Sequence, residues 1–214
     1  MRRAGLLVCE LDRGFVATDE LRVACVREAA RAEGWPESDL APPLEPTDGI
    51  DAMVATLAQA LRRTDAAECA LIALRAGDAF RHAARAGVRW RPGASAFLDA
   101  ASDVLPVGII TRLPRAVVDA VLPSERQAQC RFLWCSDEVA PDAAWARAAQ
   151  RLSPGTTGVA LIDRADSAAR AEAAGWCTVW LGDGGDSFAS AQWRIFPEDV
   201  AAALASLVNR PARF

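Results

Sequence analysis

The sequence predicts an α/β fold, a doubly wound parallel sheet with a helical segment inserted after its first strand. From residue 88 onward, short apolar runs alternate with helical patterns, which is typical of a parallel sheet covered by helices. Between residues 18 and 86 the patterns are helical only, so this segment interrupts the sheet without adding strands. We therefore expect a core of residues 1–17 and 87–214 and a helical domain of residues 18–86.

The expected strands are apolar runs bounded by turn residues. They are Leu6–Cys9, Pro106–Thr111, Cys130–Cys135, Gly158–Asp163 and Cys177–Leu181, with Ile195–Phe196 as a short last strand. Because the alternating pattern indicates a parallel sheet, we expect the runs at 6–9, 107–110 and 159–162 to be adjacent and parallel.

The expected helices share apolar positions spaced at the helical period. In the insertion they are Asp19–Gly34, Ile50–Arg63, Ala66–Arg75 and Asp78–Ala86. In the core they are Ala94–Ala101, Leu113–Leu122, Pro141–Leu152, Asp166–Ala174 and Pro197–Val208. Local signals mark some of the ends, since Asp48 and Gly49 precede the second helix and Gly175 closes an Ala-rich helix as a C-cap.

Composition limits the classes of partner. The chain has 214 residues, 52% of them hydrophobic, which is enough for one core and a small added domain. A net charge of −4 gives no electrostatic case for nucleic acid or an anionic membrane as partner, and no apolar run approaches the ~20 residues of a membrane span. The six cysteines form no CxxC pair and several lie in apolar runs, which favours a reducing, cytoplasmic location. No feature indicates the oligomeric state.

Polar side chains stand where three of the expected strands end. Glu10 and Asp12 follow the first strand, and Thr111 and Asp163 end two later ones. Because the carboxyl ends of parallel strands meet at one edge of a sheet, we expect these side chains to converge. Carboxylate and carbonyl oxygens suit Mg²⁺, and a hydroxyl beside the N–H groups of a following helix suits phosphate. Singly, such acids are ordinary solvated residues or helix caps, but the ordered set favours a site.

Four segments follow one another in the order of a known set of motifs: Gly5–Thr18, Val107–Arg112, Ser136–Asp142 and Leu161–Gly175. They resemble the four motifs of the haloacid dehalogenase-like (HAD) superfamily, in the C1-cap branch that includes phosphoglycolate phosphatase and β-phosphoglucomutase. The resemblance implies a Rossmann-like core with a helical cap. It also implies Mg²⁺-dependent hydrolysis of a phosphate monoester through an aspartyl-phosphate, with a small phosphorylated metabolite as partner.

The resemblance also implies roles for individual residues. Glu10 stands at the position of the nucleophile, Asp12 at that of the general acid/base and Thr111 at that of the phosphate-binding hydroxyl, which makes these three the candidate catalytic residues. The implied metal ligands are Glu10, Asp12 through its carbonyl, and Asp163. Thr111 and Arg112 are the candidate phosphate-binding residues.

The chain departs from the family pattern at several catalytic positions. Glu10 replaces the nucleophilic Asp, and its extra methylene moves the attacking oxygen by roughly an ångström, a misplacement that can cost ~10²-fold in rate. The third motif lacks its Lys, and the chain contains no Lys at all. Ile162 replaces the first acid of the fourth motif and Arg164 its Ser. We therefore expect a phosphatase-like protein whose hydrolysis is impaired.

Two other functions remain open at this point. One is an active hydrolase that uses Glu10 in a non-standard role, and the other is a non-catalytic module that senses a phosphorylated metabolite or binds another protein. Arg13, Arg112 and Arg164 flank the same sheet edge and could attract anions in place of the missing Lys. Each of these arginines alone is more typical of a solvated surface. His82, the single histidine, is expected to be a surface or packed residue.

Overall fold

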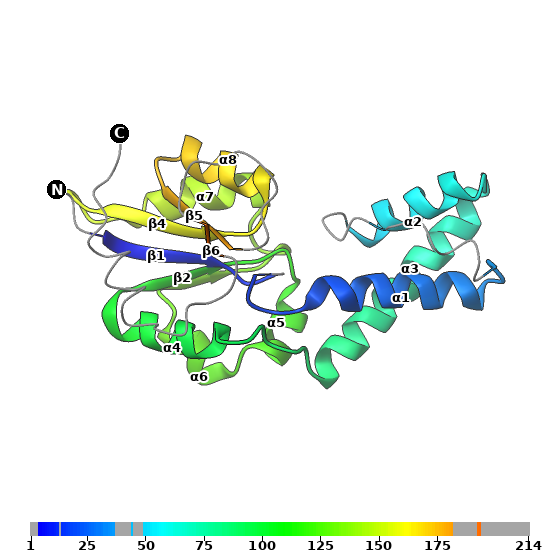
Figure 1. Cartoon of the computed structure of the whole chain (residues 1–214), viewed down its shortest axis with the longest axis horizontal. Helices are drawn as coiled ribbons and strands as arrows, with labels where there is room; N and C mark the ends of the chain where they lie inside the picture. Colours follow the sequence, from blue (N-terminus) through cyan, green and yellow to red (C-terminus); the bar gives the residue numbers. More distant parts are fainter. Residues whose placement is uncertain (1–3, 13, 37–43, 45–48, 182–191, 194–214) are drawn as a thin grey trace. The chain divides into compact units, whose positions relative to one another are not determined.

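The computed structural model describes residues 4–12, 14–36, 44, 49–181 and 192–193 (Figure 1). The chain divides into two compact units, residues 1–16 with 89–214 and residues 17–88. The expected domain boundaries lie within two residues of this division. The expected last strand, 195–196, and last helix, 197–208, lie outside the described residues.

The first unit is built on a six-stranded parallel sheet in the order β3-β2-β1-β4-β5-β6. The strands are β1 (Ala4–Glu10), β2 (Val107–Ile110), β3 (Phe132–Trp134), β4 (Thr157–Ile162), β5 (Cys177–Leu181) and β6 (Gln192–Trp193). β1 pairs with β2 on one side and β4 on the other, which confirms the expected neighbours and the α/β fold class. The strand order reverses between β1 and β4, and open α/β sheets bind ligands beside such a reversal.

Helices cover both faces of this sheet, as Figure 1 shows. One face carries α4 (Ala94–Val104), α5 (Arg115–Val121) and α6 (Ser124–Gln129), and the other carries α7 (Pro141–Ala149) and α8 (Ala165–Ala173). The short helix α6 was not among the expected helices, because its residues lack an apolar stripe and none of them is buried. The doubly wound arrangement follows from crossover connections that run over opposite faces on the two sides of β1.

Two glycines let large aromatic rings lie directly on the sheet. A methyl group added at Gly158 would lie 2.2 Å from the Trp176 ring, and one added at Gly108 would lie 2.3 Å from the Phe132 ring. Trp176 in turn meets Trp145 of α7 edge to face at 5.9 Å and donates from Nε1 to the Trp145 carbonyl at 3.2 Å. These contacts hold α7 and the end of α8 against β4.

The alternation along β1 decides which way its polar end faces. Leu6 and Val8 lie in the apolar cluster that also contains Ala168 and Ala171 of α8. Since side chains at every second position share a face of a strand, Glu10 faces the same side as Leu6 and Val8. The first candidate site residue is therefore directed toward α8.

The second unit contains α1 (Thr18–Ala32), α2 (Ile50–Ala60) and α3 (Ala66–Ala86). The expectation of two helices, 66–75 and 78–86, is wrong, because α3 is continuous through Gly77. Its buried residues are spaced four apart along the whole helix: Ile72, Ala76, Phe80 and Ala84. Burying this stripe outweighs the roughly 1 kcal/mol that one glycine costs inside a helix. Within the described ranges, no helix has both the length and the apolar character needed to span a membrane.

Candidate functional site

Asp12 and Thr111 meet where β1 and β2 end. The Thr111 hydroxyl donates to Asp12 Oδ2 at 3.1 Å, and the backbone N–H of Arg112 donates to the same oxygen at 2.6 Å. The Leu113 N–H donates to Thr111 Oγ1 at 3.1 Å, which fixes the hydroxyl. Asp12 and Thr111 are both buried. The structure thus brings together one predicted acid, the predicted phosphate-binding hydroxyl and the backbone of Arg112.

Glu10 is buried and faces the segment that follows β4. Its Oε1 accepts a hydrogen bond from the Ser167 hydroxyl in the first turns of α8, and its Oε2 accepts one from the Asp163 N–H at 3.4 Å. Each carboxylate oxygen therefore accepts a hydrogen bond from the chain itself. Ser167 was missed by the sequence analysis. Its position in the first turn of the helix that follows Asp163 is the signal that could have identified it.

The surroundings of Glu10 favour its neutral form. Burial raises its pKa from 4.5 to about 7, against the lowering effect of the hydrogen bond from Ser167. The charge of Asp12 raises the pKa further, whereas the Asp163 N–H and the charge of Arg112 lower it. Near neutral pH a large share of Glu10 is a carboxylic acid, which is a poor nucleophile.

Asp163 and the Asp12 carbonyl approach the same point beside Gly14. A methyl group added at Gly14 would lie 3.2 Å from Asp163 Oδ2 and 3.7 Å from the Asp12 carbonyl oxygen. The Gly14 N–H also donates to this carbonyl, so the loop turns back on itself here. The missing side chain of Gly14 leaves room beside two hard oxygen donors.

These donors allow a direct comparison with what Mg²⁺ requires. In the described ranges no three His, Cys, Asp or Glu side chains are grouped so that they could share one metal ion. Mg²⁺, however, keeps several water ligands and is often held by only one or two carboxylates. Asp163 Oδ2 and the Asp12 carbonyl fit that requirement, while the hydrogen bonds of Glu10 run to Ser167 and to the Asp163 N–H.

The segment that resembles the third motif is held by acidic residues. The Asp137 carboxylate accepts from the Arg115 N–H at 3.1 Å and so caps α5, and Glu138 accepts from the Arg115 guanidinium at 2.7 and 2.8 Å. Val139 is buried in the apolar cluster, and Ala140 is exposed. Ile162 lies in the same cluster with only 1% of its surface exposed, so it serves packing.

Arg112 and Arg164 both reach one acidic side chain of α8, Asp166. Arg170, also on α8, joins them. The sequence analysis named the first two arginines but missed Asp166 and Arg170. The spacing of four between Asp166 and Arg170, which places them on one helix face, is the signal that could have identified them. Arg13 lies outside the described residues.

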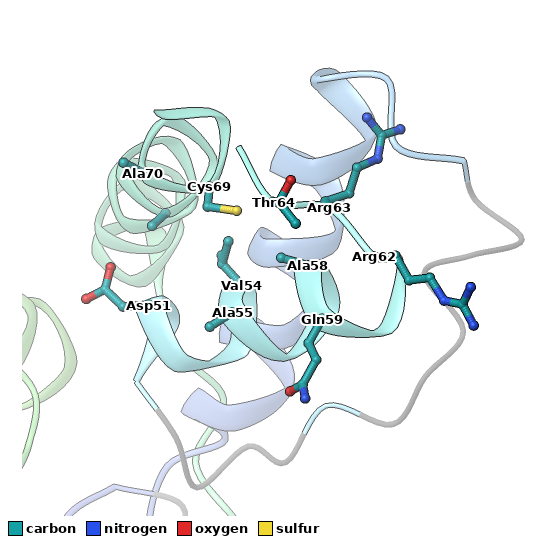
Figure 2. Close-up of a pocket in the computed structure, with 11 residues that line it drawn as sticks. Asp51, Val54, Ala55, Ala58, Gln59, Arg62, Arg63, Thr64, Cys69 and Ala70 are labelled. Atoms are coloured by element: carbon teal, nitrogen blue, oxygen red, sulfur yellow. The ribbon is translucent and has the colours of Figure 1, made fainter. Parts of the chain in front are cut away.

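A separate hollow of about 570 Å³ lies between α2 and α3 in the second unit (Figure 2). Its walls are mostly small or apolar, including Val54, Ala58 and Cys69, and the Arg62 side chain points outward at its rim. None of the predicted site residues lines it. The hollow and the strand-end site are therefore two different features of the chain.

Comparison with known proteins gives a consistent fold. No protein-family model and no curated protein sequence matches the chain. A HAD-superfamily hydrolase from Geobacter sulfurreducens superposes with a TM-score of 0.69 at 13% identity, over 95% of this chain and 97% of that one. The HAD-hydrolase YfnB from Bacillus subtilis, solved with bound magnesium, gives 0.69 at 13% identity over 95% and 100% of the two chains.

CbbY from Rhodobacter sphaeroides, solved in complex with phosphate, gives a TM-score of 0.66 at 21% identity over 92% of this chain and 96% of that one. At such identities the similarity defines the fold, and function has to be argued from the site. The sheet order, the helical insertion after β1 and these superpositions together show that the chain has a HAD-like fold, with an α/β core of the Rossmann type.

Proposed function

We propose that this chain is a phosphatase-like protein that binds a small phosphorylated metabolite at the strand ends of its core and hydrolyses it poorly. The phosphate would lie against the Thr111 hydroxyl and the Arg112 backbone. Both groups donate to the Asp12 carboxylate in this structure, so a bound phosphate would take these two donors over from Asp12. The helical unit, residues 17–88, would be the cap domain of this protein.

One observation carries the proposal of impaired hydrolysis: the state of the Glu10 carboxylate. Both of its oxygens accept hydrogen bonds from the β4–α8 segment, and burial raises its pKa to about 7. A nucleophile needs an ionised oxygen aimed at the phosphorus atom. Glu10 is instead held at Ser167 and is often protonated, and the acidic segment from Asp137 to Ala140 brings no cation to offset charge.

Mg²⁺ is the cofactor that the donor set favours. Asp163 and the Asp12 carbonyl would hold the ion, with Glu10 as the third predicted ligand, and bound Mg²⁺ would supply neutralisation of phosphate charge. This chain's own residues would do the rest. Thr111 and the Arg112 N–H would orient the phosphate by turning to it from Asp12, to which both donate in this structure.

The experiment that tests this function is ligand binding with a matched variant. Thermal unfolding is followed with and without phenyl phosphate, in millimolar Mg²⁺ and in EDTA. We expect phenyl phosphate to raise the unfolding temperature of the native protein, more so with Mg²⁺, and to raise that of Thr111→Val less. Val keeps the shape of Thr and removes the hydroxyl. No shift in the native protein, or an equal shift in Thr111→Val, would contradict the proposed site.

A further inference from the structure

Three arginines converge on one carboxylate at the carboxyl edge of the sheet. Arg112 Nη2 donates to Asp166 Oδ2 at 2.5 Å, Arg170 Nη1 donates to the same oxygen at 2.8 Å, and Arg164 Nε donates to Oδ1 at 3.0 Å. These contacts hold the pKa of Asp166 well below its usual range, against the effect of its partial burial. We call Arg112, Arg164, Arg170 and Asp166 the arginine cluster.

The cluster follows from the strand order. Arg112 lies two residues after the end of β2, and Arg164 lies two residues after the end of β4. Because β2 and β4 flank β1, these two arginines stand on either side of the strand that carries Glu10. Asp166 and Arg170 lie one turn apart on α8 and bring the two sides together.

The ion pairs of the arginine cluster hold the pKa of Asp166 low, and the repulsion between the three like charges of the arginines opposes the stability that they contribute. Here three guanidinium groups share one carboxylate, so these four residues carry a net positive charge. The three arginine side chains keep 15% to 34% of their surface exposed, so a ligand can still reach them.

We propose that the arginine cluster is a second oxyanion site, distinct from the position at Thr111, and that it takes a phosphate group. Guanidinium groups recognise phosphate through planar, paired N–H donors. One guanidinium from the segment after β2 and two from the segment after β4 can surround a tetrahedral anion. Two negative charges on the anion would offset the excess positive charge of the four residues. Asp166 acts here as a positioning residue that keeps the three guanidinium groups together.

Arg112 links the two positions. Its backbone N–H donates to Asp12, beside Thr111, and its guanidinium donates to Asp166 in the arginine cluster. The phosphate could be free inorganic phosphate or a group carried by an organic ester. The two sources share the same chemistry at the arginines and are separated below by the choice of probe.

Isothermal titration with inorganic phosphate, at constant ionic strength set with NaCl and in EDTA, tests the proposal. We expect Arg164→Gln and Arg170→Gln each to weaken phosphate binding ~10-fold or more, since each removes a charged hydrogen-bond donor. Arg151→Gln, which removes one exposed arginine after α7, is the matched control and should bind as the native protein does. Arg164→Lys keeps the charge and should recover part of the affinity, which separates lost binding from misfolding.

Thr111→Val distinguishes this site from the proposed function. If the arginine cluster binds phosphate, binding persists in Thr111→Val. Loss of all phosphate binding in Thr111→Val, with Arg164→Gln and Arg170→Gln unaffected, would overturn the cluster as a site and leave the proposed function standing. Equal weakening by Arg151→Gln would also overturn it, because the binding would then follow net charge alone. A parallel titration of Thr111→Val with phenyl phosphate identifies the source, because that variant lacks the Thr111 position. Binding equal to that of inorganic phosphate means that the arginine cluster accepts esters, and binding confined to inorganic phosphate means that it takes the free anion.

Discussion

At the scale of single residues, Glu10 and Ser167 form the contact on which the account depends. Glu10 ends β1 on the face that α8 covers, and its longer side chain reaches the Ser167 hydroxyl. Burial favours the protonated carboxyl, and the hydrogen bonds favour the ionised one. The balance leaves Glu10 titrating in the neutral range, where an ordinary glutamate would already be ionised.

This balance predicts a pH dependence of stability. The folded-state pKa of Glu10 is about 7 and its ordinary value is 4.5, so the fold prefers the protonated form. The stability contributed by that form is fully present below pH about 4.5 and is lost as pH rises through about 7, by up to roughly 3 kcal/mol. Glu10→Gln should remove this loss, as measured by urea unfolding at several pH values in EDTA. Glu125→Gln, an exposed glutamate of α6, is the control and should keep the native profile; an identical slope in Glu10→Gln would contradict the assignment.

Ser167→Ala gives the complementary test at the same contact. Removing the hydroxyl takes away a donor to the ionised carboxylate, so the pKa of Glu10 should rise above about 7. The free energy of unfolding should fall by about 1–3 kcal/mol at a pH where Glu10 is ionised. Carbon-13 NMR of the Glu10 carboxyl measures the pKa directly. Ser102→Ala, which removes a hydroxyl bound to the Leu98 carbonyl in α4, should leave that pKa where it is. A fall in the pKa of Glu10 on Ser167→Ala would refute the role of Ser167.

At the scale of elements, the position of α8 depends on how closely Trp176 lies on β4. The ring occupies the space that a side chain at Gly158 would need, and its indole N–H is bound to α7. The first turns of α8 then carry Asp166 and Ser167 to the ends of β1 and β2. The packing of Trp176 at the amino end of β4 therefore affects where α8 places Asp166 and Ser167 at the carboxyl end of the sheet.

Gly158→Ala tests this packing. The added methyl would lie 2.2 Å from the Trp176 ring, so the ring and α8 must shift, and we expect a loss of about 1–3 kcal/mol in the free energy of unfolding. Gly77→Ala in α3 is the contrasting variant, because its methyl would lie 3.5 Å from Arg81 Nη1, an ordinary contact. That change should stabilise its helix by up to about 1 kcal/mol. Urea unfolding measures both, and a neutral Gly158→Ala would contradict the packing argument.

Sequence reasoning was most successful where apolar pattern alone decides structure. The runs at 6–9, 107–110 and 159–162 form adjacent strands, as expected. They could be predicted because buried parallel strands are almost continuously apolar. Gly77 misled the helix prediction, because burial of the α3 stripe depends on partners far away in sequence. Ser167, Asp166 and Arg170 were missed for a related reason. Local spacing places Asp166 and Arg170 on one helix face, but the contacts of Asp166 with Arg112 and of Ser167 with Glu10 join segments that are far apart in the sequence.

At the scale of the whole molecule, the chain combines a HAD-like fold with a changed set of strand-end groups. Asp12, Thr111 and Asp163 lie at the proposed phosphate and metal positions, while the position that the resemblance gives to the nucleophile carries a hydrogen-bonded glutamate. Changing Ile162 to the acid that the family pattern has at this position would place a charge inside the apolar cluster, so this change is not a useful restoration. The exposed Ala140, rather than the buried Val139, is the position for a lysine.

Restoration should accordingly be cooperative. Groups that act as a unit are non-additive, so Glu10→Asp alone should recover little phosphatase activity. Glu10→Asp combined with Ala140→Lys should exceed the product of the two single effects, because the shorter acid and the added cation act on the same phosphate. Initial rates of phosphate release from phenyl phosphate in Mg²⁺ measure this, with Glu10→Asp combined with an Arg151→Lys change as the control. A full recovery by Glu10→Asp alone would show that side-chain length is the whole defect.

The most direct measurement is Mg²⁺-dependent hydrolysis of phenyl phosphate by the native protein, beside Glu10→Gln. The account predicts a native rate near the background of the uncatalysed reaction and no further loss on Glu10→Gln, since the carboxylate held at Ser167 contributes little to attack. Rapid, Mg²⁺-dependent turnover by the native protein that Glu10→Gln abolishes would contradict the account and make Glu10 a working catalytic residue.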